Sequence, residues 1–197
     1  MKDGFELRKS SGKGEGIFAT KSFKVGDIVM VGVIKEVLNG NHSHASQIGE
    51  NEYVLHAELI SKVNHSCDPY CGIRVNETGA HDFVAIRNIS INEEIVFDYA
   101  MRNYGVDYFQ KQCMCGSKRC RGRITGWKDL PDEQKKEYEG FVAPYLLELD
   151  AKHSCEKVQG IQNDESKNPR NPTKPSTRTL KSGVVSATPT PAAESGR

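Results

Sequence analysis

Three cysteines within eight residues constrain this chain more than any other feature of its sequence. Cys113, Cys115 and Cys120 surround a Gly-Ser turn, which lets the chain fold back and direct three sulfurs toward one point. Structural zinc sites are almost always tetrahedral with four protein ligands. Three clustered thiols without a metal would be prone to oxidation. We therefore predict that the cluster binds a structural zinc ion and takes its fourth ligand from elsewhere in the chain.

The identity of the fourth ligand is open at this point. The histidines, Cys67, Cys71 and Cys155 are the candidates. Cys155 is adjacent to a polar C-terminal stretch and would be a poor structural ligand, and spacing alone does not choose between Cys67 and Cys71. No apolar run approaches the roughly 20 residues that span a bilayer, and the N-terminus lacks a signal-peptide pattern. We expect a soluble, intracellular protein without a membrane partner, whose cysteines are metal ligands or buried thiols rather than disulfides.

The composition changes near residue 150. All 15 aromatic residues precede it, whereas five of the eight prolines follow it. Residues 151–197 carry eight basic and four acidic side chains, although the whole chain has a net charge of only +1. This stretch has too little apolar surface to offset the entropy of ordering, so we predict a disordered tail. A net charge near zero argues against binding nucleic acid by charge alone, which leaves the basic tail as the only region suited to it.

Short apolar runs rich in Val and Ile recur between Gly, Asn and Asp clusters, a pattern typical of many short strands. The strand candidates are Gly16–Ala19, Ile28–Lys35, Glu52–Leu55, Ile73–Val75, Phe83–Ile86 and Glu94–Asp98. Helical periodicity is confined to the end of the core, after start signals at Asp129 and Pro131. Pro144 interrupts this run, so we expect two short helices or one kinked helix. The sequence predicts a mainly β fold with short helices.

Four motifs in this order resemble a SET-domain protein lysine methyltransferase with a post-SET zinc segment. The motifs are Gly14-Glu15-Gly16, Asn64-His65-Ser66-Cys67-Asp68-Pro69, Glu93-Glu94-Ile95-Val96-Phe97-Asp98-Tyr99, and the cysteine cluster followed by Arg121-Gly122. A lone Gly-x-Gly would be weak evidence, but four ordered motifs across residues 5–125 make chance agreement remote.

The resemblance implies small, curved β-sheets around a pseudoknot, in which the segment carrying Asn64 passes beneath a loop closed near Tyr99. It implies a SET domain over residues 1–110, a post-SET zinc segment over 111–125, a helical extension over 126–150 and the tail over 151–197. It also completes the zinc site, because the family pattern adds Cys67 to the three clustered cysteines. Cys71 is then an ordinary core thiol.

The resemblance further implies that S-adenosyl-L-methionine is the methyl donor. The cofactor-binding residues it indicates are Lys13, Gly14, Glu15, Gly16, Asn64, His65 and Tyr99. Glycines permit close backbone approach, while the Asn64 amide and the His65 imidazole can bond to polar edges of the cofactor. Taken singly, the glycines are more typical of a turn, and the two polar residues of satisfied buried groups.

Tyr99 is the catalytic tyrosine by resemblance, with its hydroxyl near the methyl group and the target nitrogen. Phe97 falls where the family places Phe or Tyr in the lysine channel. Because Phe lacks a hydroxyl that could hold a water or a partly methylated amine, we expect dimethylation or trimethylation. The second channel residue is open: His44 stands where relatives often have a tyrosine, and Tyr53 is the alternative. Tyr70, where many members have Asn, adds bulk near the expected metal and cofactor.

These features predict an enzyme that methylates a lysine in a protein or peptide, such as a histone tail or a non-histone protein. We expect a monomer, nuclear if the source is eukaryotic and cytoplasmic otherwise. The alternative is a catalytically silent SET-like zinc module. It would bind a peptide or nucleic acid through the tail and a basic cluster formed by Lys118, Arg119, Arg121 and Arg123.

Overall fold

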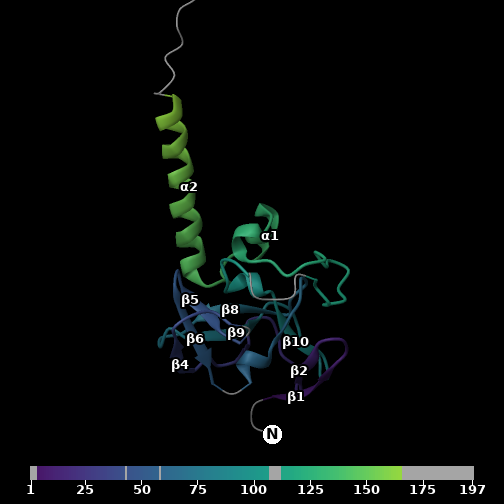
Figure 1. Cartoon of the computed structure of the whole chain (residues 1–197). Helices are drawn as coiled ribbons and strands as arrows, with labels where there is room; N and C mark the ends of the chain where they lie inside the picture. The colour runs from purple at the N-terminus through teal and green to yellow at the C-terminus, as the bar shows by residue number, and fades with distance from the viewer. Residues whose placement is uncertain (1–3, 43, 58, 107–111, 166–197) are drawn as a thin grey trace, which may run out of the picture. The chain divides into compact units, whose positions relative to one another are not determined.

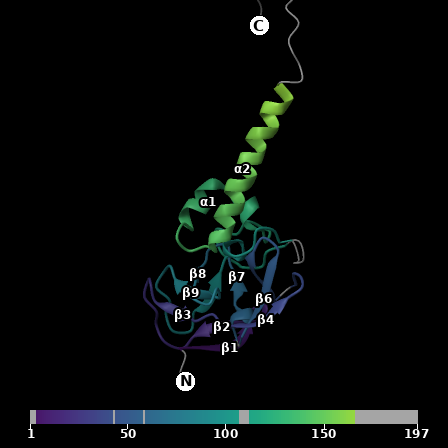
Figure 2. The same cartoon turned by 90° about the vertical axis from the view of Figure 1, so that its left-hand side faces the viewer.

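The computed structural model describes residues 4–42, 44–57, 59–106 and 112–165, and from residue 155 onward only the path of the helix. Figures 1 and 2 show strands gathered in layers, with helix α1 and the start of helix α2 at one end of them. The strands are β1 (Phe5–Ser10), β2 (Gly14–Ala19), β3 (Ile28–Met30), β4 (Ile34–Leu38), β5 (Ser46–Gly49), β6 (Glu52–His56), β7 (Asn64–His65), β8 (Cys71–Val75), β9 (His81–Ala85) and β10 (Glu94–Phe97). The helices are η1 (Ile60–Lys62), η2 (Tyr99–Met101), η3 (Trp127–Asp129), α1 (Asp132–Glu137) and α2 (Pro144–Glu165), where η denotes a 3-10 helix.

The larger sheet brings the motif segments together. Its strand order is β1-β2-β10-β8-β9-β3, and β7 also pairs with β10. The β7–β10 pairing is parallel and sets Asn64 opposite Val96 and His65 opposite Phe97. On its other side β10 pairs with β2, where Ile95 faces Ile17. Strand β10 therefore places the segment that begins at Asn64 beside the segment that leads into Tyr99.

A second sheet has the order β4-β6-β5. The sequence predicted one strand over Ile28–Lys35, but the structure divides this stretch into β3 of the larger sheet and β4 of the smaller one. Gly32 lies at the division. Its N–H donates to the Asp82 carboxylate at 2.7 Å, and a Cβ there would overlap the His81 backbone. The prediction of a single strand was wrong because this close approach turns the chain from one sheet into the other.

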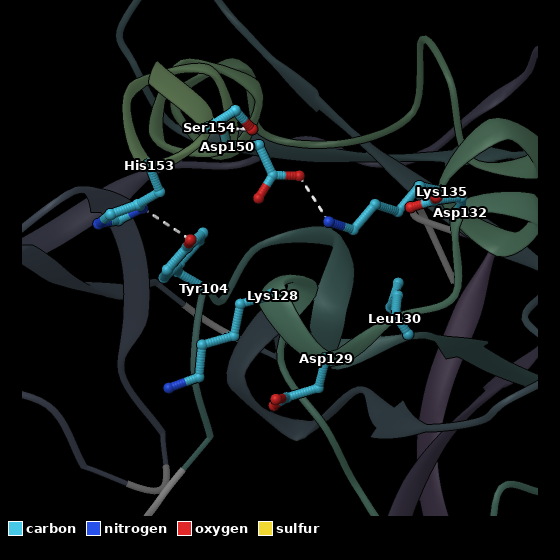
Figure 3. A pocket seen from close by; sticks show the side chains of 9 residues that line it. All are labelled: Tyr104, Lys128, Asp129, Leu130, Asp132, Lys135, Asp150, His153 and Ser154. Carbon is cyan, nitrogen blue, oxygen red and sulfur yellow. Dashed lines mark hydrogen bonds and ion pairs between the residues drawn. The ribbon is translucent and has the colours of Figure 1, made fainter. Parts of the chain in front are cut away.

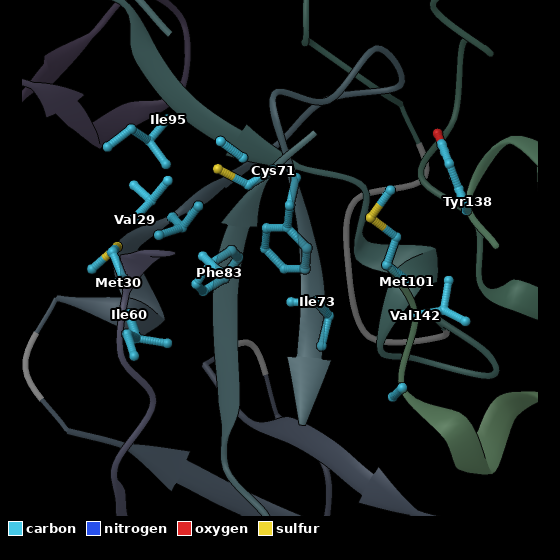
Figure 4. Packing of buried hydrophobic residues seen from close by; sticks show 14 of the residues in the cluster. Val29, Met30, Ile60, Cys71, Ile73, Phe83, Ile95, Met101, Tyr138 and Val142 are labelled. Carbon is cyan, nitrogen blue, oxygen red and sulfur yellow. The ribbon is translucent and has the colours of Figure 1, made fainter. Parts of the chain in front are cut away.

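The larger sheet and the C-terminal helices share one hydrophobic core (Figure 4). Ile73, Phe83 and Ile95 of the larger sheet are fully buried in it, and Trp127 and Leu146 of the C-terminal region belong to the same cluster. Backbone bonds add to this contact, because Ile73 donates to the Phe141 carbonyl at 2.8 Å. Residues 126–150 are therefore packed as part of the core.

Two separate helices, α1 and α2, are present as expected from Pro144, which is the first residue of α2, but α2 has 22 residues and is not short. Proline is tolerated there because the first turn needs no N–H donor. Helix α2 continues to Glu165, so this part of the chain is helical beyond residue 150, where the predicted tail begins. The rest of that tail, residues 166–197, lies outside the described residues. Among the described helices, none combines the length and apolar character needed to cross a membrane.

Candidate active site

Four cysteine sulfurs meet beside β7. The Sγ atoms of Cys67, Cys113, Cys115 and Cys120 all lie within 4.8 Å of one another. The Cys67 and Cys113 sulfurs are 3.7 Å apart, far beyond the length of a disulfide bond. A tetrahedron with zinc–sulfur bonds of about 2.3 Å has sulfur–sulfur edges of about 3.8 Å. The cluster therefore has the donor set and the spacing of a four-thiolate zinc site.

The electrostatics of the cluster favour a bound cation. Burial raises the pKa of Cys67 to about 11 and also raises that of Cys113. Burial would raise the pKa of Cys115 too, but the Cys67 and Ser117 backbone N–H groups and the neighbouring thiols lower it to about 6. Buried thiols held this close cannot all ionise unless a metal compensates their charge. Cys71 lies apart in the core, where burial raises its pKa to about 12, which confirms it as a core thiol.

A cavity of about 240 Å³ lies next to the sulfur cluster. Lys13, Asn64, His65 and Tyr99, all predicted cofactor-binding residues, line it. The remaining lining residues are Gln112, Met114, Cys115 and Ile124. The cavity thus combines cationic, amide, imidazole and phenol groups with two apolar side chains, and one cysteine of the sulfur cluster forms part of its wall.

Glu94 joins the polar groups on one side of this cavity. Its carboxylate accepts hydrogen bonds from Lys13 Nζ at 2.6 Å and from Asn64 Nδ2 at 2.8 Å. Asn64 Nδ2 also donates to the Glu15 carbonyl at 2.8 Å. A Cβ at Gly16 would overlap both the Glu94 carboxylate and the Asn64 amide, so a larger residue here would displace these two side chains. Gly14, Glu15 and Gly16 therefore support the cavity from β2 without lining it.

His65 and Tyr99 meet at the start of η2. The Tyr99 backbone N–H donates to His65 Nδ1 at 3.3 Å, and the two rings lie edge to face with centroids 5.2 Å apart. Burial lowers the pKa of His65 to about 4, so the ring is neutral. Because Nδ1 accepts, the ring proton is on Nε2, which lies 3.3 Å from the Cys67 sulfur. The Tyr99 hydroxyl donates to the Val63 carbonyl at 3.3 Å. His65 thus contacts both Cys67 of the sulfur cluster and Tyr99.

The comparison with protein families decides the identity of this region. The SET domain model matches residues 14–100, which contain both glycines of β2, the Asn64–Cys67 segment and Tyr99. Residues 14–100 therefore match the SET domain family. The sulfur cluster draws its other three cysteines from the segment that follows this domain.

Curated relatives of this SET domain are much longer proteins. A histone-lysine N-methyltransferase of Mycosarcoma maydis, described as H3 lysine-36 specific, is 33% identical over 91 residues, which are 43% of this chain and 9% of that relative. The histone-lysine N-methyltransferase ATX2 of Arabidopsis thaliana is 29% identical over 150 residues, 64% of this chain and 14% of the relative. The chain therefore spans only a small part of the relatives it matches.

Solved structures share the fold. The crystal structure of Arabidopsis thaliana SUVH6 in complex with SAM matches with a TM-score of 0.51 and 22% identity, over 61% of this chain and 33% of that one. KRYPTONITE, in complex with mCHG DNA and SAH, matches with a TM-score of 0.50 and 23% identity, over 63% of this chain and 29% of that one. At this level of identity the match establishes the SET fold.

Phe97 does not line the cavity of this SET domain. Its side chain is fully buried between the Phe83 ring, at a centroid distance of 4.8 Å, and the Tyr99 ring, at 5.0 Å. The Arg102 guanidinium covers the Phe97 ring at 4.7 Å from its centroid. Phe97 is therefore packed against the proposed catalytic tyrosine rather than exposed to the cavity beside it.

The other departures from the family pattern lie outside the cavity. The Tyr70 ring carries the Arg87 guanidinium at 4.9 Å, and its hydroxyl donates to Glu93 at 3.1 Å. His44 is exposed, with its ring 3.3 Å from the Ser61 carbonyl, and Tyr53 is in β6. Neither His44 nor Tyr53 lines the cavity.

Glu94 and Asp98 had no predicted role beyond their place in a motif, and Arg121 was predicted only as part of the basic cluster of the silent-module alternative. Asp98 has no solvent exposure and receives two hydrogen bonds from Arg121, at 2.6 and 2.9 Å. A carboxylate inside a strand-like apolar run, such as Ile95 to Tyr99, is the sequence signal that could have indicated these contacts. A buried charge requires a partner.

A second, larger cavity of about 890 Å³ lies between η3, α1 and the start of α2 (Figure 3). Several of the polar side chains that line it are bonded to one another. Tyr104 bonds to His153 at 2.8 Å, and Lys135 bonds to Asp150 at 2.5 Å. The Trp127 indole also donates to Asp150, at 2.8 Å. This cavity contains none of the motif residues.

Proposed function

We propose that this chain is an S-adenosylmethionine-dependent protein lysine N-methyltransferase. The observation that supports this most strongly is the convergence of Lys13, Asn64, His65 and Tyr99 on one cavity. Asn64 and His65 come from one motif and Tyr99 from another, and Lys13 directly precedes a third, so the four residues are up to 86 positions apart in the sequence. The named relatives, histone-lysine N-methyltransferases, support the same class of reaction.

The residues around the smaller cavity fit S-adenosylmethionine. When bound, this cofactor supplies a methyl group on a cationic sulfur. Lys13 offers a donor to a carboxylate or hydroxyl, and the Asn64 amide oxygen offers an acceptor, because both amide hydrogens of Asn64 are donated to Glu94 and Glu15. Met114 and Ile124 offer apolar surface to a planar base. Glu94 holds the Lys13 and Asn64 groups in place, so that little ordering is needed when a ligand binds.

Catalysis in this proposal is mainly a matter of positioning. A substrate lysine has a pKa of about 10.4 in water, and desolvation together with nearby positive charge favours its neutral form, which is the nucleophile. Tyr99 presents its hydroxyl from the start of η2, and the Val63 carbonyl fixes the direction of that hydroxyl. A fixed dipole beside the reacting atoms stabilises the transition state without reorganisation.

The zinc ion of this proposal is structural. Four cysteine ligands leave no open position for a substrate or water, so the metal takes no part in the chemistry. Its role is to tie the segment 113–120 to Cys67 and so to hold Met114 and Cys115 against the cavity. Zinc binding would therefore contribute to folding this wall.

The proposed substrate is a lysine in an unstructured peptide, with histone tails as the leading class and chromatin as the place of action. This part of the proposal is based on the relatives, which are described as histone-lysine N-methyltransferases. Strand β5 is at the edge of the smaller sheet and could pair with an extended peptide. Because Phe97 brings no hydroxyl to the neighbourhood of Tyr99, the proposed products are the dimethyl and trimethyl forms.

The silent-module alternative relied on the tail and on four clustered cations, and two of these cations are paired with carboxylates of the chain. Arg121 is paired with buried Asp98, and Arg119 bonds to Glu137 at 2.6 and 2.8 Å. The remaining pair, Lys118 and Arg123, is thin support for a nucleic-acid surface.

The test is a methyl-transfer assay with labelled S-adenosylmethionine and a mixed nuclear protein extract, followed by mass spectrometry of the labelled lysines. We expect labelling by the wild-type chain, loss of labelling in Tyr99→Phe with zinc retained, and loss of both zinc and labelling in Cys115→Ser. Equal labelling by wild type and Tyr99→Phe would overturn the catalytic assignment. Monomethyl-lysine as the sole product at saturating cofactor would overturn the proposed product state.

A further inference from the structure

Asp98 is a contact point for three parts of the chain. Its carboxylate has no solvent exposure and accepts hydrogen bonds from both terminal nitrogens of Arg121. It also accepts one from the Tyr138 hydroxyl at 2.9 Å and one from the Ala100 backbone N–H at 3.1 Å. Arg121 follows the last cysteine of the cluster, and Tyr138 ends helix α1. One buried carboxylate thus joins β10, the cysteine segment and the C-terminal helices.

The charge balance explains why Tyr138 is needed. A buried carboxylate is costly unless it is paired and its remaining lone pairs accept hydrogen bonds. Arg121 neutralises the charge of Asp98, and Tyr138 supplies a further, uncharged donor. Burial, followed by the negative charge of Asp98, raises the pKa of Tyr138, so its hydroxyl keeps its proton. Gln134 Nε2 donates to the same hydroxyl at 2.8 Å, which directs its proton toward Asp98.

Asp98 in turn determines how η2 begins. It is the N-cap residue of this helix, and the first residue of η2 is Tyr99. Its Oδ1 atom lies 3.6 Å from His65 Nδ1, the atom that accepts the Tyr99 backbone N–H. A rotation of the Asp98 side chain would therefore disturb both the cap of η2 and the ring that holds the Tyr99 backbone.

We infer that Tyr138 is a positioning residue of the methyl-transfer site: its hydroxyl fixes Asp98, and Asp98 fixes the backbone that carries Tyr99. The helical extension thereby completes the active site. This inference rests on the function proposed above. Tyr138 itself does not line the smaller cavity, so its effect on the reaction passes through Asp98.

The test compares Tyr138→Phe with Tyr104→Phe. Each variant removes one buried or half-buried hydroxyl that joins the C-terminal helices to the rest of the chain, but only Tyr138 contacts Asp98. The Tyr104 hydroxyl bonds instead to His153, as Figure 3 shows. We expect kcat to fall about tenfold in Tyr138→Phe, with the KM for S-adenosylmethionine within about twofold of wild type. In Tyr104→Phe both constants should stay within about twofold.

A second readout needs no activity. Amide hydrogen exchange at Ala100 and Met101 should become faster in Tyr138→Phe and stay unchanged in Tyr104→Phe, because only the first variant loosens the cap of η2. Equal effects of the two variants on kcat, or unchanged exchange in η2 of Tyr138→Phe, would overturn the inference. If exchange responds as expected while the wild-type chain transfers no methyl group, the proposed function fails and the linkage from Tyr138 to η2 stands.

Should Tyr138→Phe fold poorly, Gln134→Met provides a milder form of the same test. It leaves the Tyr138 hydroxyl in place but removes the donor that directs its proton. We expect a fall in kcat of about threefold and faster exchange at Ala100. Wild-type values of both quantities in Gln134→Met would contradict the inference.

Discussion

Two cavities in the described part of the chain differ in size and in chemistry, and the smaller of these two contains the groups suited to catalysis. The cavity between the C-terminal helices is about 890 Å³, and the cavity beside the sulfur cluster is about 240 Å³. In the larger cavity Lys135 and His153 are bonded to Asp150 and Tyr104, which line the same cavity. In the smaller one Asn64 and His65 of one motif meet Tyr99 of another, next to a cysteine cluster.

This difference shows that volume alone is a poor guide to function in this fold. The larger cavity is lined by residues of η3, α1 and α2, and the ion pair between Lys135 and Asp150 joins the two α-helices across it. The smaller cavity depends on contacts between segments that are remote in sequence, above all the parallel pairing of β7 with β10. Substitutions can therefore separate the two, because those at the smaller cavity should affect the reaction and those at the larger one should affect packing.

The largest effect is expected from removing the metal site. In Cys115→Ser we expect loss of zinc and a fall in methyl transfer of at least about 100-fold, because Cys115 belongs both to the sulfur cluster and to the cavity wall. Metal analysis and the transfer assay measure the two effects. Cys71→Ala is the matched control, since it removes a core thiol and should lower stability while zinc is retained. Full activity of a zinc-free Cys115→Ser chain would break the link between the cluster and the cavity.

Tyr99→Phe should have the next largest effect. Loss of its hydroxyl removes a fixed dipole beside the reacting atoms, so we expect kcat to fall about 100-fold. Steady-state kinetics at saturating cofactor measure this. Tyr104→Phe, which removes a hydroxyl from the larger cavity, should stay within about twofold of wild type. A larger fall in Tyr104→Phe than in Tyr99→Phe would reverse the assignment of the two cavities.

A smaller effect is expected from Glu94→Gln. The glutamine amide lacks the negative charge that holds Lys13 Nζ, and its NH2 group cannot accept the hydrogen bond from Asn64. The KM for S-adenosylmethionine should therefore rise about tenfold with a modest change in kcat. Glu93→Gln is the adjacent control, because the Glu93 carboxylate contacts Tyr70 and the Ser90 backbone instead. Equal KM values for the two variants would show that Glu94 does not organise the residues that bind the cofactor.

The smallest effect is a change in the pH dependence of stability, expected at the contact between the two sheets. His56 and His81 are buried with ring centroids 5.5 Å apart; His56 bonds to the Ser46 hydroxyl and accepts the His81 backbone N–H. Burial, and then the charge of nearby Arg102, lowers the pKa of His56 to about 4 and lowers that of His81 as well. Both rings are therefore neutral in the folded chain near pH 7.

Because these pKa values are lower in the folded than in the unfolded chain, the unfolded state binds more protons in acid. Stability should be highest above pH 6.5 and fall between pH 6.5 and about 4, by about 1 kcal/mol from pH 7 to pH 6. Urea unfolding at several pH values measures this. His65 also has a lowered pKa, so His56→Gln is compared with wild type to isolate the contribution of the sheet joint. An identical pH dependence in His56→Gln would contradict the assignment.

Much of the larger sheet could be predicted from local pattern, because strands such as β9 and β10 are short apolar runs between turn residues. Strands β1, β5 and β7 were missed. Only Phe5 and Leu7 mark β1 as a strand before a polar stretch, and β7 is two polar residues long. Such a segment becomes a strand only because β10 lies beside it. Tertiary pairing therefore defines the elements that carry the motif residues.

The site was predictable where chemistry is local. Three cysteines at close spacing indicated a metal cluster, but spacing could not choose between Cys67 and Cys71, and the choice of Cys67 came from family resemblance. The structure brings Cys67 to the cluster because β7 leads directly into it. The role of Glu94 could not be predicted, since a carboxylate in a charged motif looks exposed until its partners are known. The apolar run around Asp98 could have indicated a buried carboxylate but not its partners.

The central claim is that the smaller cavity, and not the larger one, holds S-adenosylmethionine. Photo-crosslinking of radiolabelled S-adenosylmethionine to the full chain, followed by peptide mapping, tests it directly. The account predicts label in peptides that contain Lys13, Asn64 to His65 or Met114, and a large loss of label in Asn64→Ala. Label concentrated in peptides from α1 or the start of α2, unaffected by Asn64→Ala, would contradict it.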